Sequence, residues 1–193
     1  MPYDISQIGA KLYRWESYLQ SFSLPSWQEL PTIELYMDQV VTLLSEYLNF
    51  LPPDEHGNAA ITASTVNNYV RLKMMPPPVK KRYNRVHLAY LILICTLKQS
   101  VNMTYVQKMI PMGLSPEQVQ TLYERYTRIH RKTCEFFLEQ TRIKARSVTH
   151  YDGSLPDAVE ELVFTSAIIS GFSKLLTEKI VRLQTEQPAG DSE

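Results

Sequence analysis

The longest apolar run of this 193-residue chain, Leu88 to Cys95, constrains the fold more than any other segment. With Leu97 it predicts a helix that is apolar on nearly every face, and such a helix belongs in the centre of a core. The run is far shorter than the roughly 20 residues that cross a bilayer. The N-terminus lacks a basic segment followed by an apolar one. We therefore expect neither a membrane span nor a secretory signal.

Apolar residues spaced three and four apart predict helices on both sides of this central one. Ile5 to Phe22 forms one stripe, on a helix of about residues 3–22, and a second helix is expected from Thr32 to Phe50. Thr62 has the position of an N-cap for a helix that runs to about Lys73. Asn84 is expected to cap the central helix. A short helix follows near residues 104–110.

The C-terminal part also has a helical pattern. Ser115-Pro116-Glu117-Gln118 combines an N-cap, a first-turn proline and a capping-box glutamine. A heptad seam then continues for about 25 residues and predicts a dimerisation surface of Val119, Leu122, Tyr126, Ile129, Phe136 and Ile143. We expect a turn at residues 150–154 and a last helix opened by Pro156. The sequence thus predicts a mainly α protein, with strands only in a possible two-stranded wing around Val79 to Tyr83.

Charge is segregated along the chain although the whole is neutral. Residues 1–55 contain two Lys or Arg and eight Asp or Glu, residues 56–116 contain eight and none, and residues 117–193 contain ten and twelve. A block of 61 residues with basic but no acidic side chains indicates that the middle of the chain faces a polyanion, and nucleic acid is the expected partner.

The helix from Thr62 has two faces within this block. Val66, Tyr69 and Val70 fall toward one side, while Ser64, Asn67, Asn68 and Arg71 follow at i, i+3, i+4 and i+7 on another. Asn can bond bidentately to adenine and Arg to guanine, so this stripe suits the major groove. It also fits a plain solvent-facing surface. The basic turn that follows, with the buried helix behind it, favours a winged helix-turn-helix.

The run Thr65 to Pro77 resembles the recognition-helix signature of MerR-type regulators, and the run Lys81 to Leu88 resembles their wing. Residues from about Leu30 to Ile110 are more closely similar to an uncharacterised bacterial domain family with this MerR-like core. The resemblance implies sequence-specific binding of double-stranded DNA as a homodimer. It implies the following DNA-binding residues: Thr62, Ser64, Thr65, Asn67, Asn68, Tyr69, Arg71, Lys73, Lys80, Lys81, Arg82, Tyr83 and Arg85.

Within this set, Tyr69 matches a tyrosine whose hydroxyl contacts the DNA backbone in MerR regulators, but it could equally be a core residue. Two features depart from the MerR pattern. The loop before Thr62 is longer than the tight MerR turn, and Asn67-Asn68 replace the usual Arg-Tyr pair. The bases that are read therefore cannot be carried over. MerR relatives often sense a ligand, and a small-molecule effector is possible here, although no sensor motif is visible.

Other classes of function find less support in the sequence. His130 and Cys134 lie four apart, but a closed metal site normally takes four ligands. There is no phosphate-binding loop, nucleophile elbow or paired-His motif, so we expect no catalytic residues, cofactor or metal. Two cysteines without a disulfide framework suit a reducing cytoplasm. The runner-up is a helical protein-protein interaction module that does not bind DNA.

The expected organisation has four parts. Residues 1–30 form a helix that packs on the body, and residues 31–111 form the MerR-like winged helix-turn-helix. Residues 112–187 form a helical dimerisation or sensor region. Residues 188–193 are a disordered tail.

Overall fold

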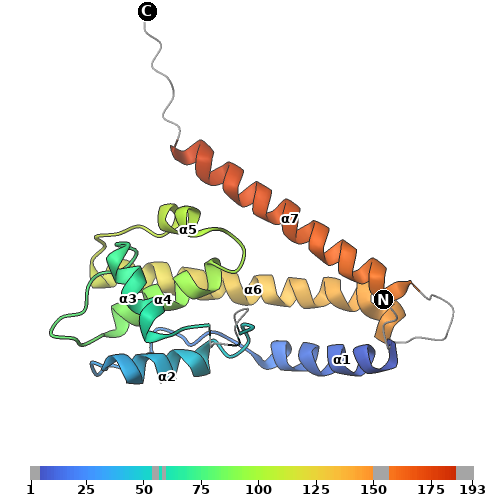
Figure 1. The fold of residues 1–193 in the computed structure, drawn as a ribbon, viewed down its shortest axis with the longest axis horizontal. Helices are drawn as coiled ribbons and strands as arrows, with labels where there is room; N and C mark the ends of the chain where they lie inside the picture. Colours follow the sequence, from blue (N-terminus) through green and yellow to red (C-terminus); the bar gives the residue numbers. More distant parts are fainter. Residues whose placement is uncertain (1–4, 54–56, 58–59, 150–156, 186–193) are drawn as a thin grey trace, which may run out of the picture. The chain divides into compact units, whose positions relative to one another are not determined.

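The computed structural model describes residues 5–53, 57, 60–149 and 157–185. This part of the chain contains seven α-helices and no β-strand (Figure 1). The mainly α class predicted from the sequence is therefore confirmed. The predicted turn at 150–154, the opening of the last helix at Pro156 and the tail at 188–193 lie outside the described residues. The helices are α1 (Ile5–Ser21), α2 (Met37–Tyr47), α3 (Ala63–Arg71), α4 (Arg85–Leu97), α5 (Met103–Met109), α6 (Pro116–Thr149) and α7 (Ala158–Thr185).

The chain divides into two compact units. One contains Met1–Leu24 and Thr127–Gly171, and the other contains Pro25–Tyr126 and Phe172–Glu193. Helices α2 to α5 belong wholly to the second unit, α1 belongs to the first, and α6 and α7 each contribute to both. The acid-free block of the sequence lies entirely in the second unit.

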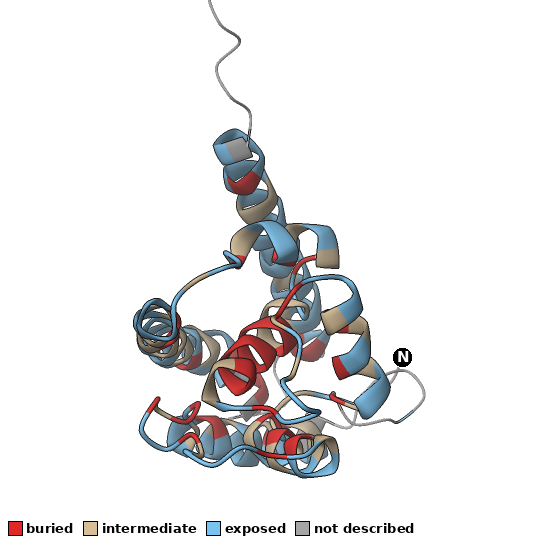
Figure 2. Ribbon diagram, turned by 90° about the vertical axis from the view of Figure 1, so that its left-hand side faces the viewer, coloured by how far each residue is buried: buried red, intermediate tan, exposed pale blue. Residues whose placement is uncertain are grey.

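Helix α4 is the centre of the second unit, as its apolar sequence predicts. Residues 87–95 are all buried, and Figure 2 shows the helix almost entirely in the colour of buried residues. Leu44 of α2 and Val66 of α3 are also buried and have no exposed surface. Burial of side chains like these is the main favourable term in folding. Because α2, α3 and α4 all contribute to one core, the position of α3 is fixed.

Side chains cap the helices where the sequence predicted them. Thr62 Oγ1 accepts from the Thr65 backbone N–H at 3.2 Å, and Asn84 Oδ1 accepts from the Val86 N–H at 3.1 Å. At the start of α6, Ser115 Oγ accepts from the Gln118 N–H at 3.3 Å, and Gln118 Oε1 accepts from the Ser115 N–H at 2.9 Å. This reciprocal pair is the predicted capping box.

Helix α2 begins later than the sequence predicted. We expected helix from Thr32, but Leu35 is extended and forms an isolated antiparallel bridge with Tyr83. The Leu35 N–H donates to the Tyr83 carbonyl at 2.8 Å, and the Tyr83 N–H donates back at 2.9 Å. Two long-range hydrogen bonds thus outweigh the local helical pattern. The possible wing is likewise smaller than expected, because Val79 and Arg82 form a second isolated bridge and no strand.

In the first unit, α1 packs against the C-terminal part of α6. Trp15 meets Phe137 edge to face with ring centroids 6.1 Å apart, and Arg142 pairs with Glu16. Val148, Ala158 and Val159 form a small buried cluster, and three partly buried side chains pack against it: Ile8, Leu12 and Leu162.

Helix α3 ends in a Schellman motif with a lysine at the position that usually holds glycine. The Met74 N–H donates to the Tyr69 carbonyl and the Lys73 N–H to the Val70 carbonyl, at 2.9 and 3.0 Å. Lys73 adopts a left-handed backbone with φ 55°. This conformation is costly for any residue that carries a Cβ atom.

We therefore expect Lys73→Gly to stabilise the protein by about 0.5–1 kcal/mol. The free energy gained by relieving the strain should exceed the free energy lost because glycine gives the unfolded chain more conformational entropy. Urea unfolding measures this. Lys73→Ala is the matched control, since it removes the same charge but keeps the strain. A Gly variant no more stable than the Ala variant would contradict the explanation.

Candidate nucleic-acid interface

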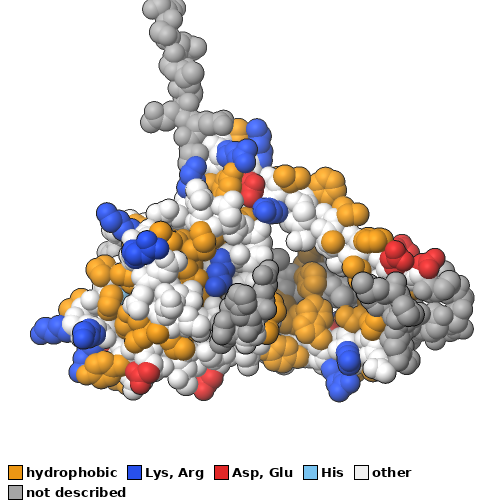
Figure 3. Space-filling model, viewed as in Figure 1, with side chains coloured by type: hydrophobic (Ala, Val, Ile, Leu, Met, Phe, Trp, Pro, Cys, Tyr) orange, Lys and Arg blue, Asp and Glu red, His pale blue; other side chains and the backbone are white. Residues whose placement is uncertain are grey.

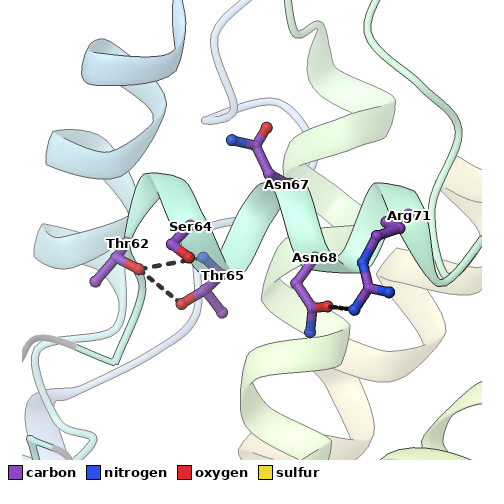
Figure 4. A pocket seen from close by; sticks show the side chains of 6 residues that line it. All are labelled: Thr62, Ser64, Thr65, Asn67, Asn68 and Arg71. Atoms are coloured by element: carbon purple, nitrogen blue, oxygen red, sulfur yellow. Dashed lines mark hydrogen bonds between the residues drawn. The ribbon is translucent and has the colours of Figure 1, made fainter.

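One face of α3 lines a shallow, open depression of about 540 Å³ (Figure 4). At its N-terminal end Thr62 and Thr65 are joined by a 2.8 Å hydrogen bond between their hydroxyls. Toward the C-terminal end Arg71 Nη2 donates to Asn68 Oδ1 at 2.7 Å. Six residues predicted to contact DNA line this depression: Thr62, Ser64, Thr65, Asn67, Asn68 and Arg71.

The bond between Arg71 and Asn68 orients both side chains. Because Asn68 uses its amide oxygen to accept from Arg71, its amide nitrogen is left to donate outward. The guanidinium of Arg71 keeps further N–H donors. The C-terminal half of the face is thus rich in donors, which suits acceptors on base edges or phosphates.

The opposite face of α3 packs into the core. Val66 has no exposed surface, and Tyr69 is 3% exposed. Burial, together with a hydrogen bond to Cys95, raises the pKa of the Tyr69 hydroxyl. The structure thus places Tyr69 among core residues, the alternative that the sequence had left open, and the DNA contact assigned to it by resemblance has no support from its position.

A tight turn carries two lysines beyond the three prolines. The Arg82 N–H donates to the Val79 carbonyl at 2.9 Å, and the two residues between them, Lys80 and Lys81, have φ of 49° and 63°. Positive φ at both central residues is the signature of a type I′ hairpin turn, which favours Asn-Gly. Both side chains are exposed.

In the part of the chain that the structure describes, every non-glycine residue with positive φ is a lysine of the acid-free block: Lys73, Lys80 or Lys81. Strained backbone of this kind tends to cluster at functional sites. The sequence analysis did not predict this backbone strain. The two-residue link between Val79 and Arg82 could have indicated it, because a hairpin connection of two residues favours positive φ at both of them.

The remaining basic residues of the turn are partly engaged in the fold. Arg82 is exposed, but it donates to the Tyr36 hydroxyl at 2.8 Å and lies over the Tyr36 ring. Arg85 donates twice to the Leu30 carbonyl, at 3.1 and 2.8 Å. Tyr36 was missed by sequence reasoning, although it directly follows the bridging residue Leu35.

Two members of the predicted DNA-binding set therefore look different in the structure. Arg85 also lies 5.5 Å from the Trp27 ring, so it holds two segments of the unit together. Tyr83 is 3% exposed and belongs to the core. Neither residue belongs to the exposed basic surface beside the turn. This surface, the basic face, consists of the depression on α3 with Lys73, Lys80, Lys81 and Arg82.

His87 connects the triple proline to the start of α4. Its Nδ1 lies 3.0 Å from the Asn84 backbone nitrogen and 2.7 Å from Asn84 Oδ1, and its Nε2 lies 3.2 Å from the Pro77 carbonyl oxygen. Burial lowers the pKa of His87 below its ordinary value of 6.5, which favours the neutral ring. These contacts fix the segment that carries the two lysines.

Acid should therefore destabilise the protein through His87. Its pKa is lower when folded, so the unfolded chain binds the proton first, and stability is lost as pH falls through about 6.5. His87→Gln should lose less stability than the unaltered protein between about pH 7 and 5, as measured by urea unfolding. His130 shifts in the same direction and is present in both proteins, so the difference isolates His87. Equal losses would contradict the assignment.

The predicted dimerisation residues divide into two groups. Val119 is fully buried and Leu122 is partly buried, while Tyr126 bonds to Thr96 on α4 through hydroxyls 2.6 Å apart. This first half of the seam packs within its own chain. The second half is exposed: Ile129 by 53%, Phe136 by 66% and Ile143 by 65%.

The described part of the chain holds neither a cluster of metal ligands nor a helix that could span a membrane. Within residues 5–53, 57, 60–149 and 157–185, no group of three or more His, Cys, Asp or Glu is arranged to hold a metal ion. Over the same ranges, every helix is too short or too polar to cross a bilayer.

Most of the second unit matches a known sequence family. Residues 25–127 match the family described as Domain of unknown function (DUF1836). The chain belongs to this family. Comparisons with curated proteins and with solved structures gave no match. The match to DUF1836 agrees with the resemblance to an uncharacterised domain family. It covers almost the same residues as the Pro25–Tyr126 part of the second unit, which carries the whole basic face.

Proposed function

We propose that this DUF1836 protein is a sequence-specific, DNA-binding transcriptional regulator that acts as a dimer in the bacterial cytoplasm. The observation that carries the proposal is the basic face itself. It joins an exposed polar helix face to a tight lysine turn, and residues 56–116 contain no acidic side chain. In Figure 3, groups of Lys and Arg side chains lie above and beside the part of the surface where α3 lies, and the acidic side chains on this face lie outside it.

The order of elements supports a MerR-like winged helix-turn-helix. A first helix, α2, is followed by a loop and by α3, then by the lysine turn and the buried helix α4. Leu35, just before α2, bridges to Tyr83 just after the turn. In a winged helix-turn-helix the second helix enters the major groove. Here that helix is α3, whose inner side is fixed by the core.

The two parts of the basic face have separate roles. Asn67, Asn68 and Arg71, with Ser64, contact base edges, because amide and guanidinium groups match the donor and acceptor patterns of the major groove. Lys80 and Lys81 contact phosphates on the flanking backbone, and Lys73 and Arg82 add to this positive field. Phosphate contacts supply affinity and register, whereas base contacts supply sequence preference.

Asn68→Ala tests the base-reading role. The change removes one base-contacting amide and the acceptor that orients Arg71, so discrimination between the preferred site and a single mismatch should fall by about 1–3 kcal/mol. Fluorescence anisotropy with matched duplexes measures both affinities. Gln99→Ala, on an exposed residue outside the basic face, is the control. Unchanged discrimination in the Asn68 variant would exclude this residue from base reading.

A second candidate function, a helical interaction module without DNA binding, is favoured by the exposed aromatic side chains on α6. Phe136 is 66% exposed and Phe137 is 47% exposed. Adjacent exposed apolar side chains often mark interaction surfaces. This candidate predicts that the purified chain ignores duplex DNA even at low salt.

A further inference from the structure

A groove lies between α2 and the segment that leads into this helix. Its volume is about 370 Å³, and it is open to solvent rather than enclosed. Part of its lining is apolar, from Pro31, Ile33, Leu35 and Leu43. Ile33 is 68% exposed, and Leu43 is partly buried. All of the lining belongs to the second unit, so the groove lies within one compact body.

The same groove is acidic. Asp38 and Glu46 line it and are exposed, and their separation of eight residues on α2 sets them about 12 Å apart along the helix axis. Among the described residues, neither carboxylate forms an ion pair. Residues 25–70 contain six Asp or Glu and no Lys or Arg. In Figure 3, acidic side chains lie at the lower edge of this unit, where Figure 1 places α2. The groove therefore carries uncompensated negative charge.

An apolar lining with unpaired carboxylates indicates the chemistry of an occupant. Negative charge repels nucleic acid, so the groove is not a continuation of the basic face, with which it shares no residue. Small ligands favour pockets that bury most of their surface. An open groove beside a helix suits a partner helix that lays its apolar side chains into the groove. Charge complementarity requires that this partner helix be basic.

We propose that the groove binds an amphipathic helical segment of another protein, whose apolar side chains are flanked by Lys or Arg. The apolar side chains contact Ile33 and Leu43, and two basic side chains about two helical turns apart meet Asp38 and Glu46. This function goes beyond DNA binding and does not depend on it. The basic face stays free while the groove is occupied, so the protein has two surfaces of opposite charge for two different partners.

Selection from displayed peptides tests the chemistry of the partner. A random library of peptides of about 15 residues, roughly four helical turns, is selected on the full chain. We expect an enriched class with apolar residues between two Lys or Arg about two turns apart. In calorimetric titrations, a peptide of this class should bind the Asp38→Asn, Glu46→Gln chain about tenfold more weakly than the unaltered chain. No enrichment of this class, or equal binding to both chains, would overturn the proposal.

Two further variants separate docking in the groove from general attraction between opposite charges. Glu139→Gln with Glu160→Gln removes the same charge at exposed positions outside the groove and should leave peptide binding unchanged. Ile33→Ala keeps every charge and should weaken peptide binding about fivefold, because an apolar contact is lost. The proposal fails if the control pair weakens binding as much as the groove pair does, or if Ile33→Ala has no effect.

A second copy of the chain is the competing occupant, because Val79 is 66% exposed and is followed by Lys80 and Lys81. Light scattering without peptide decides between the two. The unaltered chain and the Asp38→Asn, Glu46→Gln chain should have the same mass. A mass that falls in this variant would assign the groove to self-association and overturn the proposal. None of these experiments contains DNA, so their failure is distinguishable from failure of the DNA-binding function.

Discussion

Replacing Lys80 by Asn and Lys81 by Gly should lower the affinity for duplex DNA on the order of 100-fold at about 0.1 M salt. Each phosphate contact that a lysine makes releases a counterion and is worth about tenfold under these conditions. The slope of log affinity against log salt should fall by about two per chain. Anisotropy titrations over a range of salt concentrations measure both quantities. The loss should be similar for all sequences, because phosphates carry no base information.

The Lys80→Asn, Lys81→Gly variant removes the two charges without disturbing the fold. Asn-Gly is the sequence that a type I′ turn favours, so the turn between Val79 and Arg82 should be retained or stabilised, and urea unfolding should show no loss of stability. Lys80→Arg with Lys81→Arg is the matched control, since it keeps both charges and should retain binding. If the Asn-Gly variant binds DNA like the unaltered protein, the lysine turn is not a phosphate contact.

Ile92→Ala should destabilise the protein by about 3 kcal/mol, the largest stability effect expected of a single truncation discussed here. Ile92 has no exposed surface and lies in the middle of α4, which is buried along most of its length. Removing buried methyl and methylene groups costs their transfer free energy plus the free energy of the cavity. Urea unfolding monitored by circular dichroism measures the change. This loss would be a large fraction of the stability of a typical domain.

Ile33→Ala is the control for this experiment, because Ile33 is 68% exposed and the same atoms are removed. Its effect should stay within about 0.5 kcal/mol. The comparison tests whether α4 forms the core against which α3 is fixed. Equal effects at the two positions would contradict the central place of α4.

The sequence predicted those features that local chemistry determines. The caps at Thr62 and Asn84 and the capping box at Ser115 are local hydrogen bonds, and the burial of α4 follows from its apolar residues. The stripe on α3 could also be predicted, because a nine-residue helix with one buried side must present the other. The structure places six of the predicted residues around one depression.

Features that depend on contacts distant in sequence could not be predicted. Leu35 leaves the helical pattern because it bonds to Tyr83, and Arg85 is held by the Leu30 carbonyl, 55 residues away. Tyr83 showed no sign of burial in its spacing, whereas Tyr69 shared one side of its helix with Val66 and Val70 but could be assigned either to the core or to DNA. The heptad seam on α6 was read as one surface, but its first half packs inside the chain. The positive φ of Lys80 and Lys81 was also missed, because lysine rarely adopts this backbone.

The central claim is that the basic face reads a DNA sequence, and selection from genomic DNA fragments tests it most directly. The purified full chain is incubated with fragments of its host genome at roughly 50 mM salt, and the bound fraction is sequenced. We predict an enriched inverted repeat, whose symmetry reflects the two-fold symmetry of a dimer. The absence of any enriched sequence, together with no measurable binding to duplex DNA at that salt concentration, would contradict the claim.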